Sequence, residues 1–304
     1  MNYNLKDINE KIKSDAKTLV KESELNYQSQ IEEAVNQLLS DTTNHYKFVL
    51  LAGPSSAGKT TTSHLFKENL KLNGIKAQVI SVDNFFLERE ETPKLPNGNY
   101  DYESLRALDW DLFGVKMKEL IENKKSILPV FDFVDGKKYF TDEYTTLNDN
   151  EIIIIEGLHA LNPIINNYIP VELAYKVYLN TVSEFVNDEE TILNKENIKL
   201  VRRLIRDYKK RGAPPKRTID TYSDVTDGEK QYITPFMDTA NYKINTTHAF
   251  EPSVYYNFLV EIQKEAPCDK LQDLIEKLKP YEKITYDLIP SNSLTQEFLG
   301  GNNN

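Results

Sequence analysis

One cysteine, Cys268, is all that the 304-residue chain contains, which excludes an intramolecular disulfide framework and suits a reducing compartment. Long apolar runs are also missing. None approaches the roughly 20 residues that span a bilayer, and the first residues lack the apolar core of a signal peptide. Acidic residues outnumber basic ones by 47 to 37, a net charge of −10, which argues against a broad nucleic-acid-binding surface. We therefore expect a soluble, cytoplasmic protein without nucleic-acid or membrane partners, in which any anion-binding site is local.

What the chain does contain is the run GPSSAGKT at residues 53–60, which matches the P-loop pattern G-x-x-x-x-G-K-[ST] in full. It follows an apolar run at 48–52, predicted to be a buried strand, and precedes a helix predicted over 60–73. A chance glycine-rich turn is the alternative, and the order of strand, loop and helix argues against it. The pattern predicts a nucleoside triphosphate site.

In such a loop the glycines let backbone N–H groups turn toward phosphate oxygens, and the helix N-terminus adds partial positive charge. Lys59 would reach the β- and γ-phosphates, and the Thr60 hydroxyl would bind Mg²⁺. The predicted triphosphate-binding residues are Gly53, Ser55, Ser56, Ala57, Gly58, Lys59, Thr60 and Thr61.

Strands alternate with helices along the chain, which predicts an α/β fold with a parallel sheet of about five strands flanked by helices. Further strands are predicted at 76–83, 128–134 and 152–155, the last one continuously apolar, as central parallel strands are. Helices are predicted after the N-cap Asp109 and over 197–210.

We divide the chain into an N-terminal helical arm at 1–44, a P-loop domain at 45–265 and a C-terminal extension at 266–304. The arm is charged, with sparse apolar positions, so either packing on its own domain or an oligomer contact would account for it. Within the extension, the sequence pattern predicts a short helix near 271–278 and a strand at 284–289.

Two carboxylates follow predicted strands directly. Asp83 ends the strand after the P-loop helix, and Glu156 ends the isoleucine-rich strand. Because the C-terminal ends of parallel strands open on the ligand side of the sheet, both would face the phosphates. Asp83 suits a base for an alcohol and Glu156 a Mg²⁺ ligand, direct or through water. Solvated strand-end carboxylates are the alternative.

Three arginines form the next candidate group. Arg203 and Arg206, three positions apart on a predicted helix, share one face, and Arg211 follows them. A guanidinium group can donate two parallel hydrogen bonds to phosphate oxygens. These arginines could therefore close over a transferring phosphoryl group. A solvated basic helix face is the alternative.

Together these residues resemble the uridine kinase and phosphoribulokinase family of P-loop kinases, and within it most closely the uridine–cytidine kinases, over about residues 47–245. The motifs appear in the family's order: GPSSAGKTT at 53–61, SVDNFF at 81–86, YDY at 100–102 with ALDWD at 107–111, VFDFV at 130–134, EG at 156–157, RRLIRD at 202–207 with RG at 211–212, and QYI at 231–233. Three positions depart from the family pattern: Phe131 stands where the family has a base-contacting Tyr, and Gly136 and Tyr102 stand where it has His.

The resemblance implies a transfer of the γ-phosphoryl group of ATP, with Mg²⁺ held near Thr60 and Glu156. It implies that Asp83 is the base for a 5′-hydroxyl and that Lys59 and Arg206 are catalytic. Arg211 would bind the ATP phosphates as part of the lid. The implied nucleoside-binding residues are Asp101 at the ribose, Phe131, Arg203 and Gln231.

We therefore expect an ATP-dependent nucleoside 5′-kinase, with uridine or cytidine as the first candidate substrate and a role in pyrimidine salvage. Two alternatives stay open. The chain could phosphorylate another small alcohol, such as a sugar phosphate or pantothenate, or it could be a nucleotide-binding regulator without turnover. Asp83 favours catalysis, because a sensor has no need of a base.

Overall fold

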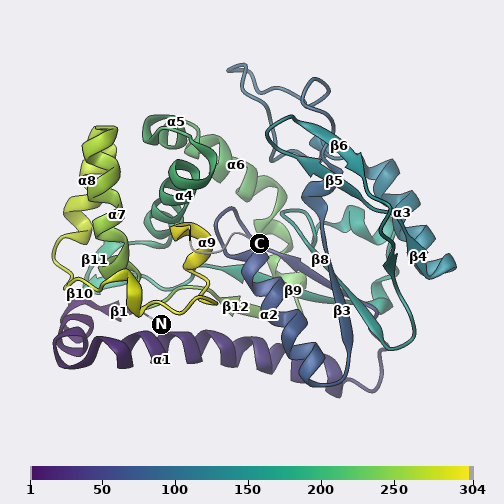
Figure 1. Cartoon of the computed structure of the whole chain (residues 1–304), viewed down its shortest axis with the longest axis horizontal. Coiled ribbons are helices and arrows are strands. Elements are labelled where there is room, and N and C mark those ends of the chain that lie inside the picture. The colour runs from purple at the N-terminus through teal and green to yellow at the C-terminus, as the bar shows by residue number, and fades with distance from the viewer. Residues whose placement is uncertain (1, 301–304) are drawn as a thin grey trace.

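The computed structural model describes residues 2–300. At its centre lies a five-stranded sheet with the strand order β12-β9-β2-β8-β3 (Figure 1). All neighbouring pairs in it are parallel. The predicted α/β fold with a parallel sheet is confirmed. The strands are β2 (Phe48–Ala52), β3 (Lys76–Ser81), β8 (Glu151–Glu156), β9 (Ala174–Asn180) and β12 (Tyr242–Asn245).

Each face of the sheet has its own hydrophobic cluster, because successive strand residues point to opposite faces. In β2, Val49 and Leu51 belong to the first cluster, and Phe48 and Leu50 to the second. Burial on both faces explains why β2 and β8 are almost continuously apolar. The first cluster includes residues of α1 (Leu5–Ser40), α2 (Lys59–Leu72), α4 (Lys195–Arg211), α7 (Glu251–Glu265) and α8 (Asp269–Leu278); the second includes residues of α3 (Trp110–Asn123).

The other elements are short and lie around the sheet. β1 (Tyr3–Asn4), β10 (Phe185–Asn187) and β11 (Glu190–Leu193) form a small separate sheet. Two antiparallel pairs join β5 (Pro129–Asp132) to β6 (Lys137–Phe140) and β4 (Lys125–Ser126) to β7 (Thr145–Thr146). The remaining helices are α5 (Pro215–Asp220), α6 (Tyr222–Tyr232) and α9 (Gln296–Leu299).

Three predicted strands differ from the structure. The strand expected at 128–134 is limited to Pro129–Asp132 and pairs antiparallel with β6, outside the central sheet. The strand expected at 76–83 ends at Ser81, whose side chain accepts a hydrogen bond from the backbone N–H of Asp83 and starts a 3-10 turn, Val82–Phe85. The strand expected at 284–289 is wrong, because the segment forms a 3-10 turn at Tyr286–Leu288. There the N–H of Ile284 donates to the carbonyl of Ser253 in α7, so the segment is held by a helix rather than by a neighbouring strand.

The N-terminal arm packs on its own chain. Helix α1 runs along one side of the molecule beside the sheet (Figure 1). Its Tyr27 hydroxyl lies 2.6 Å from the Thr62 hydroxyl in α2, and its Gln30 side chain exchanges two hydrogen bonds with the backbone of Asn245. An oligomer contact for the arm stays a prediction. Within residues 2–300, no helix combines the length and apolar character needed to cross a membrane.

Candidate active site

The P-loop connects the C-terminal end of β2 to the N-terminus of α2. Gly58 adopts a left-handed conformation with φ 85°, which favours glycine. Gly53 lies so close to β9 that a Cβ atom would come within 2.6 Å of the carbonyl oxygen of Leu179. Lys59 donates from Nζ to the carbonyls of Gly53 and Pro54 at 3.0 and 3.1 Å, so its ammonium group lies across the loop. The predicted glycine-rich loop is therefore present between β2 and α2, and phosphate binding by it stays a prediction.

Asp83 and Glu156 lie at the ligand edge of the sheet. Glu156 is the last residue of β8 and pairs in register with Ser81 of β3, two residues before Asp83. Burial raises the pKa of Asp83, and the positive charges of Lys59, Arg211 and Arg206 act in the opposite direction. Burial also raises the pKa of Glu156 to about 7, and the negative charge of Asp83 adds to this rise. The two carboxyl groups and Lys59 therefore share one electrostatic environment.

The three predicted lid arginines converge on Asp207 in α4. Arg206 donates from Nη2 and Nε to Asp207 Oδ1 at 2.8 and 3.0 Å. Arg203 Nε lies 3.3 Å from Asp207 Oδ2, and Arg211 Nη1 lies 3.4 Å from Oδ1. The Asp207 side chain is only 7% exposed, so a nearly buried carboxylate holds together guanidinium groups that would otherwise repel one another.

Helix α4 and helix α6 also reach the P-loop directly. Arg203 Nη1 donates to the Ser55 hydroxyl at 2.7 Å. The backbone N–H of Ser55 donates to Glu229 Oε1 of α6 at 3.2 Å, and Glu229 is in turn paired with Lys199 of α4 at 2.6 Å. One P-loop serine is therefore held from both sides by charged groups of the helices that cover it.

The predicted nucleoside-binding residues are spread more widely. Phe131 is buried in β5 with its ring centroid 5.8 Å from that of Phe86 and 5.1 Å from that of Phe133. Asp101 is partly buried in the loop after Phe86, where its N–H donates to the carbonyl of Pro93. Gln231 is exposed on α6. The structure thus gathers the phosphate-side candidates more closely than the nucleoside-side ones.

Gly136, where the family has His, adopts φ 71° beside Arg89. A Cβ atom at this position would lie 2.8 to 3.0 Å from side-chain atoms of Arg89, whose Nη2 donates to the carbonyls of Phe133 and Val134. Arg89 therefore occupies the space beside this loop and fixes it.

Four acidic residues of the site were not predicted from the sequence. Asp207 had a detectable signal, since it lies four positions from both Arg203 and Arg211 on one helix. The other three are Glu103, Glu229 and Glu297. No local sequence pattern points to them, because they lie far along the chain from the site residues that they approach. Burial raises the pKa of Glu103 to about 7, with the charge of Arg203 acting against the rise.

A magnesium ion would need ligands beyond the protein. Within residues 2–300, no group of three or more His, Cys, Asp or Glu side chains is arranged to hold a metal. Mg²⁺ in phosphoryl-transfer sites is ordinarily held by one or two protein oxygens together with substrate phosphates and water. Thr60, exposed in the first turn of α2, and Glu156, at the sheet edge, supply oxygen donors of this kind.

Comparisons with known proteins identify the family of the chain. The model of the family described as Phosphoribulokinase / Uridine kinase matches residues 48–250. A uridine kinase of Schizosaccharomyces pombe is 32% identical over 179 residues, which cover 58% of this chain and 35% of that protein. An Arabidopsis thaliana protein named inorganic pyrophosphatase TTM2 is 27% identical over 258 residues, which cover 83% of this chain and 34% of that protein.

The chain thus spans about a third of the length of these two curated relatives. Among solved structures, one titled as a possible uridine kinase from Bacillus stearothermophilus has a TM-score of 0.50 at 16% identity, covering 71% of this chain and 97% of that one, a likeness of fold alone. The family match extends from the first residue of β2 to the turn before α7 and includes the P-loop, both sheet-edge carboxylates and the lid arginines. The chain therefore belongs to the phosphoribulokinase / uridine kinase family.

Proposed function

We propose that this chain transfers the γ-phosphoryl group of ATP to the 5′-hydroxyl of a ribonucleoside, with uridine or cytidine as the first candidate. Family membership supports the broader class, a phosphotransferase with an alcohol acceptor. The observation that carries the proposal is a carboxylate, Asp83, at the C-terminal edge of the sheet, in the electrostatic environment of Lys59, Arg206 and Arg211. A nucleotide sensor needs the lysine but has no use for this base.

In the proposed reaction Asp83 accepts the proton of the acceptor hydroxyl as that oxygen attacks the γ-phosphorus. Burial strengthens Asp83 as a base by raising its pKa, while Lys59 keeps the carboxylate form accessible. The Lys59 ammonium would leave the carbonyls of Gly53 and Pro54 and neutralise the β- and γ-phosphates. When bound at Thr60 and Glu156, Mg²⁺ would add further positive charge on the same oxygens.

The arginines of α4 would stabilise the transferring group. Arg206 and Arg211 would bind its oxygens, and Asp207 would keep both guanidinium groups oriented before the nucleotide arrives. Arg203 is tied to the P-loop through Ser55 and would follow any movement of that loop. A preformed cationic group of this kind reduces the reorganisation needed in the transition state.

A second acceptor class has a specific observation in its favour. Phe131 is packed among other phenylalanine rings, and Arg89 fills the space beside Gly136, so neither position offers a side-chain hydrogen bond to a base. A small alcohol without a base, such as a sugar phosphate or pantothenate, would need no such contact. The TTM2 relative, named as a pyrophosphatase, also shows that proteins similar to this chain carry other named activities.

The test is product analysis of the purified protein with ATP and Mg²⁺ against uridine, cytidine, adenosine, guanosine and their 2′-deoxy forms, with a sugar phosphate and pantothenate in parallel. We expect a nucleoside 5′-monophosphate as the product. If Asp101 binds the ribose hydroxyls, ribonucleosides should exceed 2′-deoxynucleosides by about tenfold or more in kcat/KM. Equal use of both forms would remove Asp101 from this role, and product from the sugar phosphate or pantothenate alone would support the second acceptor class.

A further inference from the structure

A glutamate from the C-terminal extension binds the N-terminus of the P-loop helix. Glu297, in the short helix α9, accepts hydrogen bonds at Oε2 from the backbone N–H and the hydroxyl of Thr61, at 3.2 and 2.9 Å. Thr61 is the third residue of α2, so its N–H is one of those that have no partner within the helix. These are the groups that a helix N-terminus offers to a phosphate.

The segment that carries Glu297 is held firmly against the loop. Leu294 packs on Gly58, where a Cβ atom would lie 2.3 Å from Leu294 Cδ1. The ring of Phe298 is fully buried, and the Arg202 guanidinium lies 5.1 Å from its centroid. Gln296 donates to the carbonyls of Ile289 and Pro290. Side-chain packing and hydrogen bonds therefore place Glu297 at Thr61, and displacement of residues 293–299 would break these contacts together with the carboxylate contact.

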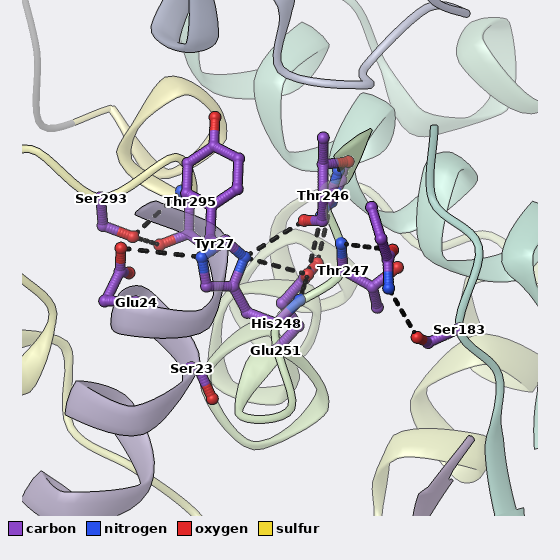
Figure 2. A network of polar contacts seen from close by, with 12 residues as sticks. Ser23, Glu24, Tyr27, Ser183, Thr246, Thr247, His248, Glu251, Ser293 and Thr295 are labelled. Atoms are coloured by element: carbon purple, nitrogen blue, oxygen red, sulfur yellow. Dashed lines mark hydrogen bonds and ion pairs between the residues drawn. The ribbon is translucent and has the colours of Figure 1, made fainter. Parts of the chain in front are cut away.

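The segment also lies beside the arm in the interior of the molecule. Figure 2 shows Ser293 and Thr295 of the segment beside Tyr27 and Glu24 of α1, with His248 next to Glu24. Ser293 and Thr295 are fully buried, and their hydroxyls lie 2.8 Å apart. The P-loop helix is thus contacted from α1 and from α9, both of which lie outside the residues that the family model matches.

A carboxylate and a phosphate group cannot share this N–H. A nucleotide phosphate that approaches Thr61 would also meet the negative charge of Glu297 in a partly buried site, where repulsion is stronger than in bulk solvent. Glu297 therefore acts on the nucleotide site in the opposite direction to Lys59. The Glu297 carboxylate thus takes the position that an anionic ligand would take at this helix N-terminus.

We propose that residues 293–299 form an autoinhibitory segment, in which Glu297 occupies a phosphate position of the nucleotide site and leaves it when nucleotide binds. This proposal rests on the proposed function, since it takes the P-loop to bind a nucleoside triphosphate. It assigns Glu297 a role in setting nucleotide affinity, although the residue lies 236 positions from Thr61 in the chain.

The first test compares the affinity of the unaltered chain, Glu297→Gln and a matched control, Glu276→Gln, for the β,γ-imido analogue of ATP by isothermal titration calorimetry. Glu276 is exposed in the same extension, where its side chain contacts Gln272 and Lys279. The glutamine keeps an acceptor for Thr61 and removes the charge. We expect Glu297→Gln to bind the analogue about fivefold or more tightly, and the control to match the unaltered chain. Equal or weaker binding by Glu297→Gln would overturn the proposal.

The second test needs no variant. Hydrogen exchange of residues 293–299 in the unaltered chain should become about tenfold faster when the analogue is added, because the bound analogue displaces the segment from the P-loop helix. Unchanged or slower exchange despite measurable binding would reject the autoinhibitory role and leave the proposed kinase activity untouched. Absence of analogue binding in all three proteins would instead reject the nucleotide site itself, and this proposal with it.

Discussion

At the scale of single residues, the site is defined by carboxyl groups whose pKa values burial has raised. Asp83 and Glu156 lie near Lys59 at the sheet edge, and Glu103 approaches from a loop. Raised carboxyl pKa values beside positive neighbours are typical of functional sites, because keeping such groups out of water costs stability. The roles of these residues can be separated by single substitutions.

Asp83→Asn should lower kcat by roughly 10²-fold or more while nucleotide affinity changes by no more than a few fold. The reason is that the base acts on the acceptor hydroxyl and makes no contact with the phosphates in the proposed reaction. Steady-state kinetics combined with calorimetric nucleotide titration measure both quantities. A collapse of nucleotide affinity with kcat largely retained would identify Asp83 as a magnesium ligand instead.

Glu103→Gln should stabilise the protein at pH 8 and have little effect at pH 5. The folded-state pKa of Glu103 is raised to about 7 from an ordinary 4.5, so folding favours its protonated form. Between these two values the folded state binds more protons than the unfolded state, and the stability of the unaltered chain falls as the pH rises. Above pH 7 the carboxylate is a net cost, on the order of 1–3 kcal/mol, that glutamine does not carry.

Urea denaturation at pH 5 and pH 8 measures this effect, with the exposed Glu276→Gln as the control. The difference in unfolding free energy between Glu103→Gln and the unaltered chain should be larger at pH 8. A difference of the same size at both pH values would mean that packing against Gly228, and not ionisation, dominates the substitution.

At the scale of elements, helix α4 combines two separate electrostatic arrangements. On its buried side Arg202 is fully enclosed and donates to both oxygens of Glu251 at 2.7 and 2.8 Å, to the carbonyl of Thr246 and to the carbonyl of Ser56 in the P-loop. On its site-facing side Arg203 and Arg206 are held by Asp207. The motif that resembles the family's lid helix therefore includes one arginine that supports structure beside Arg206, a candidate for catalysis, and Arg203, a candidate for substrate binding.

Glu251→Gln should destabilise the fold by about 3–5 kcal/mol, because it leaves the buried charge of Arg202 without its counterion. The matched control is Asp220→Asn, which removes the partner of Lys216 in an exposed pair and should change stability by less than about 1 kcal/mol. Guanidinium denaturation of both variants gives the comparison. Similar small losses for the two would show that Arg202 is satisfied by its carbonyl acceptors alone.

At the scale of the whole molecule, the three predicted segments pack into one hydrophobic cluster. Val35 of the arm, Val254 of the P-loop domain, and Leu274 and Phe298 of the extension are all among its buried members. The boundaries at 44 and 265 stay predictions about the chain, but its parts contact one another too closely to behave independently. We therefore expect ligand binding at the P-loop to raise the stability of the whole chain.

The unaltered chain should melt at a higher temperature when ATP and Mg²⁺ are present at about 100 times their dissociation constant. Binding at that excess adds about 2.7 kcal/mol, which corresponds to a shift of about 4 °C for a chain of this size. Lys59→Ala should lose most of the shift, since it removes the charge that neutralises the phosphates. Differential scanning calorimetry of both proteins tests this, and an equal shift in the two would place the nucleotide elsewhere.

The sequence by itself determined whatever depends on neighbours along the chain. The P-loop, its flanking strand β2 and helix α2, and the i, i+3 and i, i+4 spacing of the arginines on α4 are local patterns, so their geometry follows from backbone preferences and helical periodicity. The parallel sheet also followed, because apolar strands that alternate with helices have few other ways to bury both faces. The strand expected at 284–289 failed, because its conformation depends on a distant helix.

Only the tertiary structure decided which distant groups join the site. Glu229 reaches Ser55 across 174 positions, and Glu297 reaches Thr61 across 236. A buried carboxylate has no periodic signature, since its environment is made by elements that meet only after folding. The same holds for Arg202, whose counterion Glu251 lies 49 positions away. The P-loop was therefore recognisable from the sequence, whereas the distant charged groups that contact it became visible only in the folded molecule.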